Sequence, residues 1–128
     1  MRVLLDTHTF LWFIEGKPLL SITARQIVED IANERLLSIA SVWEAAIKFG
    51  TGKLELSKPF ADLIPDQLRI NDIRLFGITI EHTAQLTTLP FHHRDPFDRL
   101  LIAQAMTENL PILSVDSVFD AYAVTRLW

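Results

Sequence analysis

Two short apolar runs that each end on an aspartate constrain the fold of this chain more than any other feature. The first run covers residues 2–5 and precedes Asp6, and the second covers residues 111–115 and precedes Asp116. Such runs are typical of buried strands in a parallel sheet. Because open α/β sheets bind ligands at the carboxyl ends of their strands, we expect both carboxylates at one crevice. Two like charges about 4 Å apart repel by roughly 4 kcal/mol at an effective dielectric of 20, so a divalent cation is their expected partner.

Helical patterns alternate with short apolar strands along the rest of the chain. The clearest helix start has Asp95 at the N-cap, Pro96 at the first helical position and Asp98 at N3. This alternation indicates an α/β domain over residues 1–128, with a short, mostly parallel sheet covered by helices on both faces. We expect further helices over residues 8–15, 21–33, 38 or 41 to 49, 59–70, 79–88 and 117–122, and further strands over residues 36–39, 73–76 and 123–125.

Composition limits the class of protein. The chain has 128 residues, 49% of them apolar, and no cysteine, so we expect a buried core without disulfides or thiolate-bound metal. Its apolar runs are far shorter than the about 20 residues that span a bilayer, and Asp6 interrupts the first of them, so we expect no membrane segment, no signal peptide and a cytoplasmic location. The net charge of −4 argues against a general nucleic-acid binder, although metal-binding carboxylates also lower the net charge.

Each acidic side chain singled out here also has a purely structural explanation. Asp6 and Asp116 could cap the helices that follow them, and the helix dipole favours Asp98 at a helix start without any ligand. Glu44 precedes Lys48 by four residues, and this spacing favours a solvated pair worth about 0.2–0.5 kcal/mol. The alternative is a buried or concave surface, because small apolar residues lie on nearly every side of Glu44.

Histidines and basic residues near these acids allow two further interpretations. His92 and His93 precede Asp95 and could bind zinc with it, but adjacent histidines often point apart and no distant His or Cys completes the ligand shell. Lys48 and Arg99 are candidates for contacts to phosphate, although a surface charge is the simpler interpretation of each.

Three stretches of the chain, residues 4–8, 41–48 and 95–105, resemble the PIN-domain nucleases, and most closely the VapC-type toxins of bacterial type II toxin–antitoxin systems. Residues 110–116 and the ending, residues 126–128, fit the same pattern. The resemblance covers essentially the whole chain. It implies a three-layer PIN-like fold and a metal-dependent endoribonuclease that uses Mg²⁺ or Mn²⁺ to hydrolyse RNA phosphodiester bonds and acts as a toxin.

The resemblance also implies roles for individual residues. The acidic quartet of the family matches Asp6, Glu44, Asp98 and Asp116. The three aspartates would hold the metal, and Glu44 would bind it through water or orient the attacking water. The hydroxyl group that helps to position the site matches Ser114, with Thr7 as a second candidate beside the first aspartate. Asp98 matches the family pattern better than Asp95, which we expect to be the helix cap.

Residues 10–14 read Phe-Leu-Trp-Phe-Ile and cover more than one face of their helix. Such a helix is either buried or shared with a partner. The resemblance favours a partner, because it implies a homodimer and a cognate antitoxin protein that binds an apolar groove near Phe10, Trp12 and Phe13. The alternative function is a catalytically silent PIN-like adaptor that binds RNA or protein.

Overall fold

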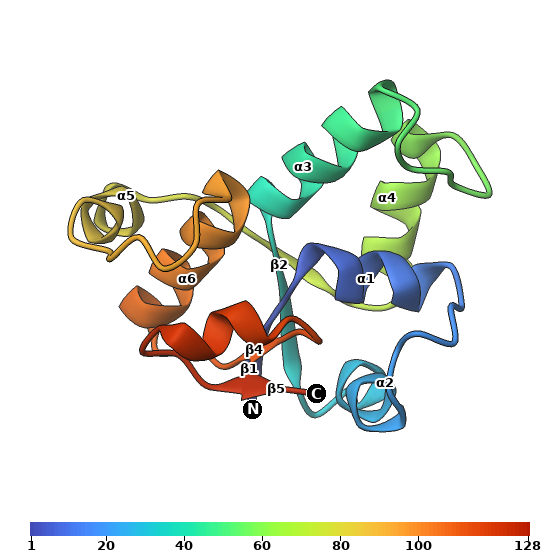
Figure 1. Ribbon diagram of the computed structural model, residues 1–128. Coiled ribbons are helices and arrows are strands. Elements are labelled where there is room, and N and C mark those ends of the chain that lie inside the picture. Colours follow the sequence, from blue (N-terminus) through green and yellow to red (C-terminus); the bar gives the residue numbers. More distant parts are fainter.

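A five-stranded parallel sheet runs through the middle of the molecule in the order β3-β2-β1-β4-β5 (Figure 1). The structure is a computed structural model that describes residues 1–128. The strands are β1 (Arg2–Leu5), β2 (Glu34–Ser38), β3 (Arg74–Phe76), β4 (Ile112–Leu113) and β5 (Arg126–Leu127). The helices are α1 (Thr7–Ile14), α2 (Ile22–Glu29), α3 (Ile39–Gly50), α4 (Phe60–Ile70), α5 (Ile80–Leu86), α6 (Pro96–Glu108) and the 3-10 helix η1 (Ser117–Ala121).

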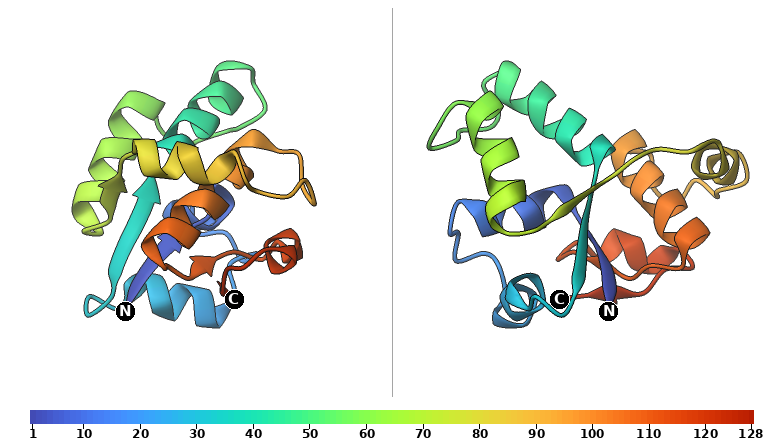
Figure 2. Two further views of the ribbon diagram at one scale, coloured as in Figure 1. Left: turned by 90° about the vertical axis from the view of Figure 1, so that its left-hand side faces the viewer. Right: turned by 180° about the vertical axis from the view of Figure 1, so that it is seen from behind.

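Apolar side chains leave the central strands toward both faces of the sheet. Val3 and Leu5 pack into one cluster with α1, α2, α3 and α4, whereas Leu4 packs into a second cluster with α5, α6 and η1. Figures 1 and 2 show the two groups of helices on opposite sides of the strands. The predicted α/β fold, with a parallel sheet between two helical layers, is therefore confirmed. No helix combines the length and apolar character that crossing a membrane requires.

The second helix is shorter than the predicted range of residues 21–33. It ends at Glu29 because Asp30 closes a turn in which its side chain accepts from the Ala32 N–H (2.9 Å) and its carbonyl from the Asn33 N–H (3.0 Å). An aspartate that bonds nearby backbone in this way competes with the helix. Strand β2 then begins at Glu34, two residues earlier than predicted.

The last strand was predicted over residues 123–125, and this is wrong. Strand β5 is Arg126–Leu127, which pairs in parallel with β4. The Arg126 guanidinium fixes this register, because it pairs with Asp120 (2.9 Å) and donates to the Ser114 carbonyl (3.2 Å).

The strand order reverses direction between β1 and β4. The chain builds outward from β1 through β2 to β3 and later fills the other side with β4 and β5. Ligands of open α/β sheets bind in the crevice at such a switch point, outside the carboxyl ends of the strands. Asp6 follows β1 and Asp116 lies shortly after β4, so the topology brings both predicted strand-end aspartates to this crevice.

Candidate active site

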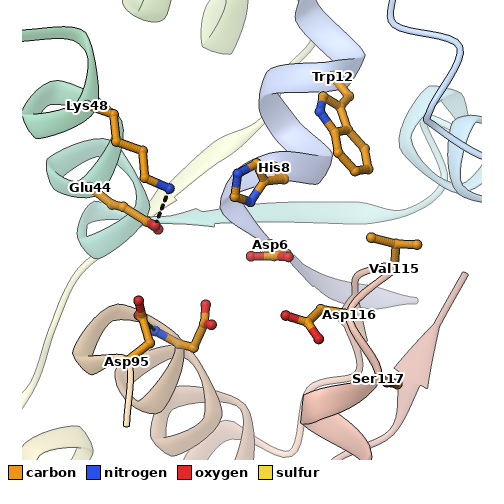
Figure 3. A pocket seen from close by; sticks show the side chains of 10 residues that line it. Asp6, His8, Trp12, Glu44, Lys48, Asp95, Val115, Asp116 and Ser117 are labelled. Atoms are coloured by element: carbon orange, nitrogen blue, oxygen red, sulfur yellow. Dashed lines mark hydrogen bonds and ion pairs between the residues drawn. The ribbon is translucent and has the colours of Figure 1, made fainter. Parts of the chain in front are cut away.

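One open cavity of about 530 Å³ lies beyond the carboxyl ends of β1 and β4. Five acidic residues from four separate parts of the chain line it, and Lys48 is its one lysine or arginine. Figure 3 shows labelled side chains of these parts around a common space. We name it the acidic cavity, and its lining residues are Asp6, His8, Trp12, Glu44, Lys48, Asp95, Asp98, Val115, Asp116 and Ser117.

Asp6 enters the cavity from its buried side and is only 5% exposed. One carboxylate oxygen accepts the Thr7 N–H (2.7 Å), so Asp6 caps α1, and the other accepts the Ser114 hydroxyl (2.7 Å). Ser114 reaches Asp6 because β1 and β4 are neighbours in the sheet. Asp6 therefore both caps α1 and lines the crevice, so its two predicted roles hold together.

Glu44 is the second buried acid, at 7% exposure on α3. Its Oε1 accepts the Thr7 hydroxyl (2.7 Å), and its Oε2 accepts from Lys48 Nζ (2.9 Å). The hydroxyls of Thr7 and Ser41 are hydrogen-bonded at 2.9 Å behind it. The predicted Glu44–Lys48 pair is therefore present, but it lies at the cavity wall and not on a solvated surface.

Asp95 and Asp98 enter from the start of α6. Asp95 caps this helix as predicted, accepting the Asp98 N–H at 2.9 Å, and it also lines the acidic cavity. The Asp98 carboxylate lies 2.7 Å from Nε2 of His93. His92 instead packs its ring against Tyr122, with centroids 5.3 Å apart. The two histidines thus have different partners, and they form no zinc site with Asp95.

Asp116 is the most exposed member of the predicted quartet. Its side chain accepts the Val118 N–H (3.0 Å) and caps η1, as its position before a helix allows. Its own N–H donates to the hydroxyl oxygen of Ser114 (3.0 Å). Ser114 therefore contacts both strand-end aspartates, through the carboxylate of Asp6 and the backbone of Asp116.

Burial and mutual repulsion raise the pKa of two acids in the cavity. Burial is the main cause of the raised pKa of Asp6, opposed by the Ser114 hydrogen bond, with a smaller contribution from the charge of Glu44. Burial also raises the pKa of Asp98 to about 6, opposed by its hydrogen bond to His93 and assisted by the charges of Asp6, Asp95 and Glu44. The cavity therefore concentrates negative charge that its single lysine does not balance.

The donor chemistry of the cavity fits a hard divalent cation. Carboxylate oxygens are the ligands that Mg²⁺ and Mn²⁺ prefer. No three histidine or acidic side chains lie close enough together to bind one ion directly. Mg²⁺ commonly binds one or two carboxylates and keeps several waters, so this wide spacing suits it. Simultaneous ligation by Asp6, Asp98 and Asp116 stays a prediction.

Comparison with known proteins places the chain in a family. The model of the PIN domain family matches residues 3–124. The chain belongs to the PIN-domain family. This PIN domain is also similar to Ribonuclease VapC16 of Mycobacterium tuberculosis (strain ATCC 25618 / H37Rv), with 42% identity over 60 residues, 47% of this chain and 43% of that protein. The match thus spans less than half of this curated relative.

Solved structures of similar fold cover almost the whole PIN domain. VapBC2 from Rickettsia felis, bound to a DNA fragment from its promoter, matches with a TM-score of 0.76 and 15% identity, over 99% of this chain and 98% of that one. A toxin-antitoxin complex from Klebsiella pneumoniae matches with a TM-score of 0.67 and 14% identity, over 98% and 96%. FitAcB from Neisseria gonorrhoeae matches with a TM-score of 0.66 and 18% identity, over 98% and 96%. At these identities the similarity shows the fold alone.

Two residues of this PIN domain have roles that sequence reasoning missed. His93 contacts Asp98, a partnership for which the short spacing of the two residues was the available signal. Arg99 is buried and donates to the carbonyls of Leu89 (3.1 Å) and Pro90 (2.8 Å). Arg99 is thus neither a phosphate contact nor a surface charge, and it holds in place the loop that carries His93.

Proposed function

We propose that this PIN domain is a metal-dependent endoribonuclease that hydrolyses RNA phosphodiester bonds and is the toxin of a type II toxin–antitoxin pair. The observation that carries the proposal is that all four predicted acids, Asp6, Glu44, Asp98 and Asp116, line one cavity. A curated relative is named a ribonuclease, and solved structures of this fold include toxin-antitoxin complexes, which supports the same function.

The aspartates would hold Mg²⁺ or Mn²⁺, with Asp6 as the best-positioned ligand because two hydrogen bonds fix its carboxylate. When bound, the cation stabilises charge on the phosphoryl oxygens and makes a water more acidic. Glu44 orients the attacking water, since Thr7 and Lys48 fix both of its oxygens at the cavity wall. Asp98 and Asp116 lie on the open side, where an RNA strand can approach.

The proposed antitoxin contact needs one correction to the predicted groove. Phe10 is 2% exposed and belongs to the core, so it cannot contact a partner. Trp12 and Phe13 are only partly buried against that core, and they remain available to a cognate antitoxin. The apolar residues 10–14 are thus shared between the core and the proposed partner surface.

We further propose that the domain forms a homodimer. Helix α3 exposes three large apolar side chains four residues apart, Ile39, Trp43 and Ile47, and Trp43 is 60% exposed. This spacing puts all three on one face of the helix, where a second copy could cover them. Ultracentrifugation should show a dimer that Trp43→Glu dissociates and that Ile31→Glu, at an exposed apolar residue elsewhere, leaves intact.

The alternative function is a catalytically silent PIN-like adaptor that binds RNA or protein. The wide spacing of the acids, which suits hydrated Mg²⁺, does not distinguish the two functions. Metal titration separates the two functions. A nuclease should gain thermal stability with Mg²⁺ or Mn²⁺ and cleave RNA only in their presence, whereas an adaptor should show neither response.

A further inference from the structure

A second cavity adjoins the acidic one and has a different charge. It has a volume of about 290 Å³ and is lined by three lysines, Lys17, Lys48 and Lys53, against two glutamates, Glu15 and Glu55. We name it the lysine cavity. It shares His8, Trp12 and Lys48 with the acidic cavity, so the two are continuous across these side chains. Figure 3 shows Lys48 and Trp12 on either side of His8 at this boundary.

The same backbone motif places Lys17 and Lys53 after the ends of two helices. Gly16 and Gly52 have positive φ angles (64° and 76°) just after α1 and α3, and each is followed by a lysine. The Lys17 N–H donates back to the Trp12 carbonyl at 2.9 Å, and the Lys53 N–H to the Lys48 carbonyl at 2.8 Å. Together with the glycine N–H bonds to the residues three positions earlier, these form two Schellman motifs. The chain therefore turns out of each helix with a lysine facing the same cavity.

The positive charge of these two lysines is available to a ligand. Neither Lys17 nor Lys53 forms an ion pair, although Lys48 is bound to Glu44. Both are exposed. Of the opposing acids, Glu15 already accepts the N–H (3.0 Å) and hydroxyl (3.4 Å) of Ser57, which binds the loop after α3 to α1.

An aromatic side chain separates the two charge environments. Trp12 lines both cavities, with its ring beside His8 (centroids 5.8 Å apart) and Trp128 (6.1 Å). Grooves that bind single-stranded nucleic acids combine positive charge along the backbone with aromatic rings on which bases stack. The lysine cavity has this combination, because two exposed lysines lie beside the half-buried indole of Trp12, which also borders the acidic cavity.

We propose that the lysine cavity is a nucleotide subsite, in which Lys17 and Lys53 bind backbone phosphate of the strand next to the bond that is cut and Trp12 stacks on a base. The proposal rests on the nucleic-acid substrate of the proposed function. It gives the strand a path across the protein, from the acidic cavity past Trp12 to the ends of α1 and α3.

Binding of a fluorescein-labelled oligouridylate strand to the Asp6→Asn protein in Mg²⁺, followed by anisotropy over a range of KCl concentrations, tests the subsite. Adding Lys17→Gln and Lys53→Gln should weaken binding and reduce the slope of log K against log[salt] by about 0.7 for each lost phosphate contact. The matched control adds Lys58→Gln and Arg69→Gln, which remove the same charge from exposed positions outside both cavities. The control should keep the salt slope of the Asp6→Asn protein.

The outcomes separate the subsite from the proposed function. If the lysine variant and the control have the same slope and affinity, the subsite is refuted and the nuclease proposal stands. The same result would follow if the lysines instead bind an acidic segment of a protein. If the Asp6→Asn protein binds no strand and the unmodified protein cleaves none, both proposals fail.

Discussion

Asp6 and Glu44 enter the acidic cavity from its buried side, whereas Asp98 and Asp116 enter it from helix starts that lie closer to solvent. On the buried side, hydroxyl groups of Ser114 and Thr7 fix the carboxylates. On the open side, neither helix-start aspartate accepts a hydroxyl group, and Asp98 bonds to His93. We call these two groups the buried half and the open half of the cavity: side-chain hydroxyls hold the first, whereas His93 and the Val118 N–H hold the second.

The buried half should carry the largest effect on activity. Asp6→Asn should reduce RNA cleavage by more than about 100-fold, beyond the loss typical of groups that only support a ligand. The metal-free melting temperature should stay the same or rise slightly, because Asn can still cap α1 and like-charge repulsion is relieved. A gel assay of cleavage and a thermal melt measure both effects. Cleavage at the unmodified rate by this variant would remove Asp6 from the site.

Glu44 and Lys48 form one ion pair but should contribute unequally. Glu44→Gln should lower kcat at saturating RNA by at least about 10-fold, because an amide cannot hold the attacking water as a carboxylate does. Lys48→Ala should change kcat only a few-fold, since the Thr7 hydroxyl still fixes Glu44. Equal losses of kcat in the two variants would show that Glu44 acts only through its ion pair with Lys48 and does not orient the attacking water.

Two threonines on α1 offer a matched test of the hydroxyl support. Thr7→Val removes a hydrogen bond to Glu44, whereas Thr9→Val removes a buried hydrogen bond to the Leu113 carbonyl (2.8 Å) that touches no acid. Thr9→Val should destabilise the fold by about 1 kcal/mol, and Thr7→Val by about 1.5–3 kcal/mol, because a hydrogen bond to a charged group is worth more. Only Thr7→Val should also reduce cleavage, by about 10-fold. If the two variants lose activity in proportion to stability alone, the hydroxyl has no role in orienting Glu44.

The open half should show the burial of Asp98, assisted by the neighbouring negative charges, in the pH dependence of stability. The pKa of Asp98 is raised to about 6, so between pH about 4 and 6 the folded carboxyl keeps a proton that the unfolded one has lost. Without metal, the free energy of unfolding should therefore fall as pH rises through this window, by on the order of 1–3 kcal/mol.

Denaturant titrations at several pH values measure this effect. Asp98→Asn should flatten the curve over the window, whereas Asp66→Asn, at an exposed position of α4, should leave it unchanged. The affinity for Mg²⁺ should also weaken as pH falls through about 6, because the cation must then displace the proton of Asp98. An unaltered slope in the Asp98→Asn protein would show that other groups cause the pH dependence.

Local patterns predicted much of the fold because its elements obey local rules. The Asp95-Pro96 start of α6 and the apolar run before Asp6 depend on neighbours only a few residues away, and both are as predicted. The end of α2 and the position of β5 were predicted wrongly. The Asp30 side chain sets the first boundary through a turn, and the Arg126–Asp120 ion pair helps to set the second, and neither contact is visible in the hydrophobic periodicity.

The sequence by itself determined that strands end on aspartates and that Glu44 sits among apolar neighbours, because strand and helix patterns are written in adjacent residues. Only the tertiary structure decided that β1 lies beside β4, so that Ser114 reaches across 108 positions to Asp6. It also decided that Thr7 supports Glu44 and that the lysines after two different helices face one cavity. Strand order and helix packing set these contacts. Both depend on how residues far apart in the sequence bury their apolar side chains together, which no local pattern specifies.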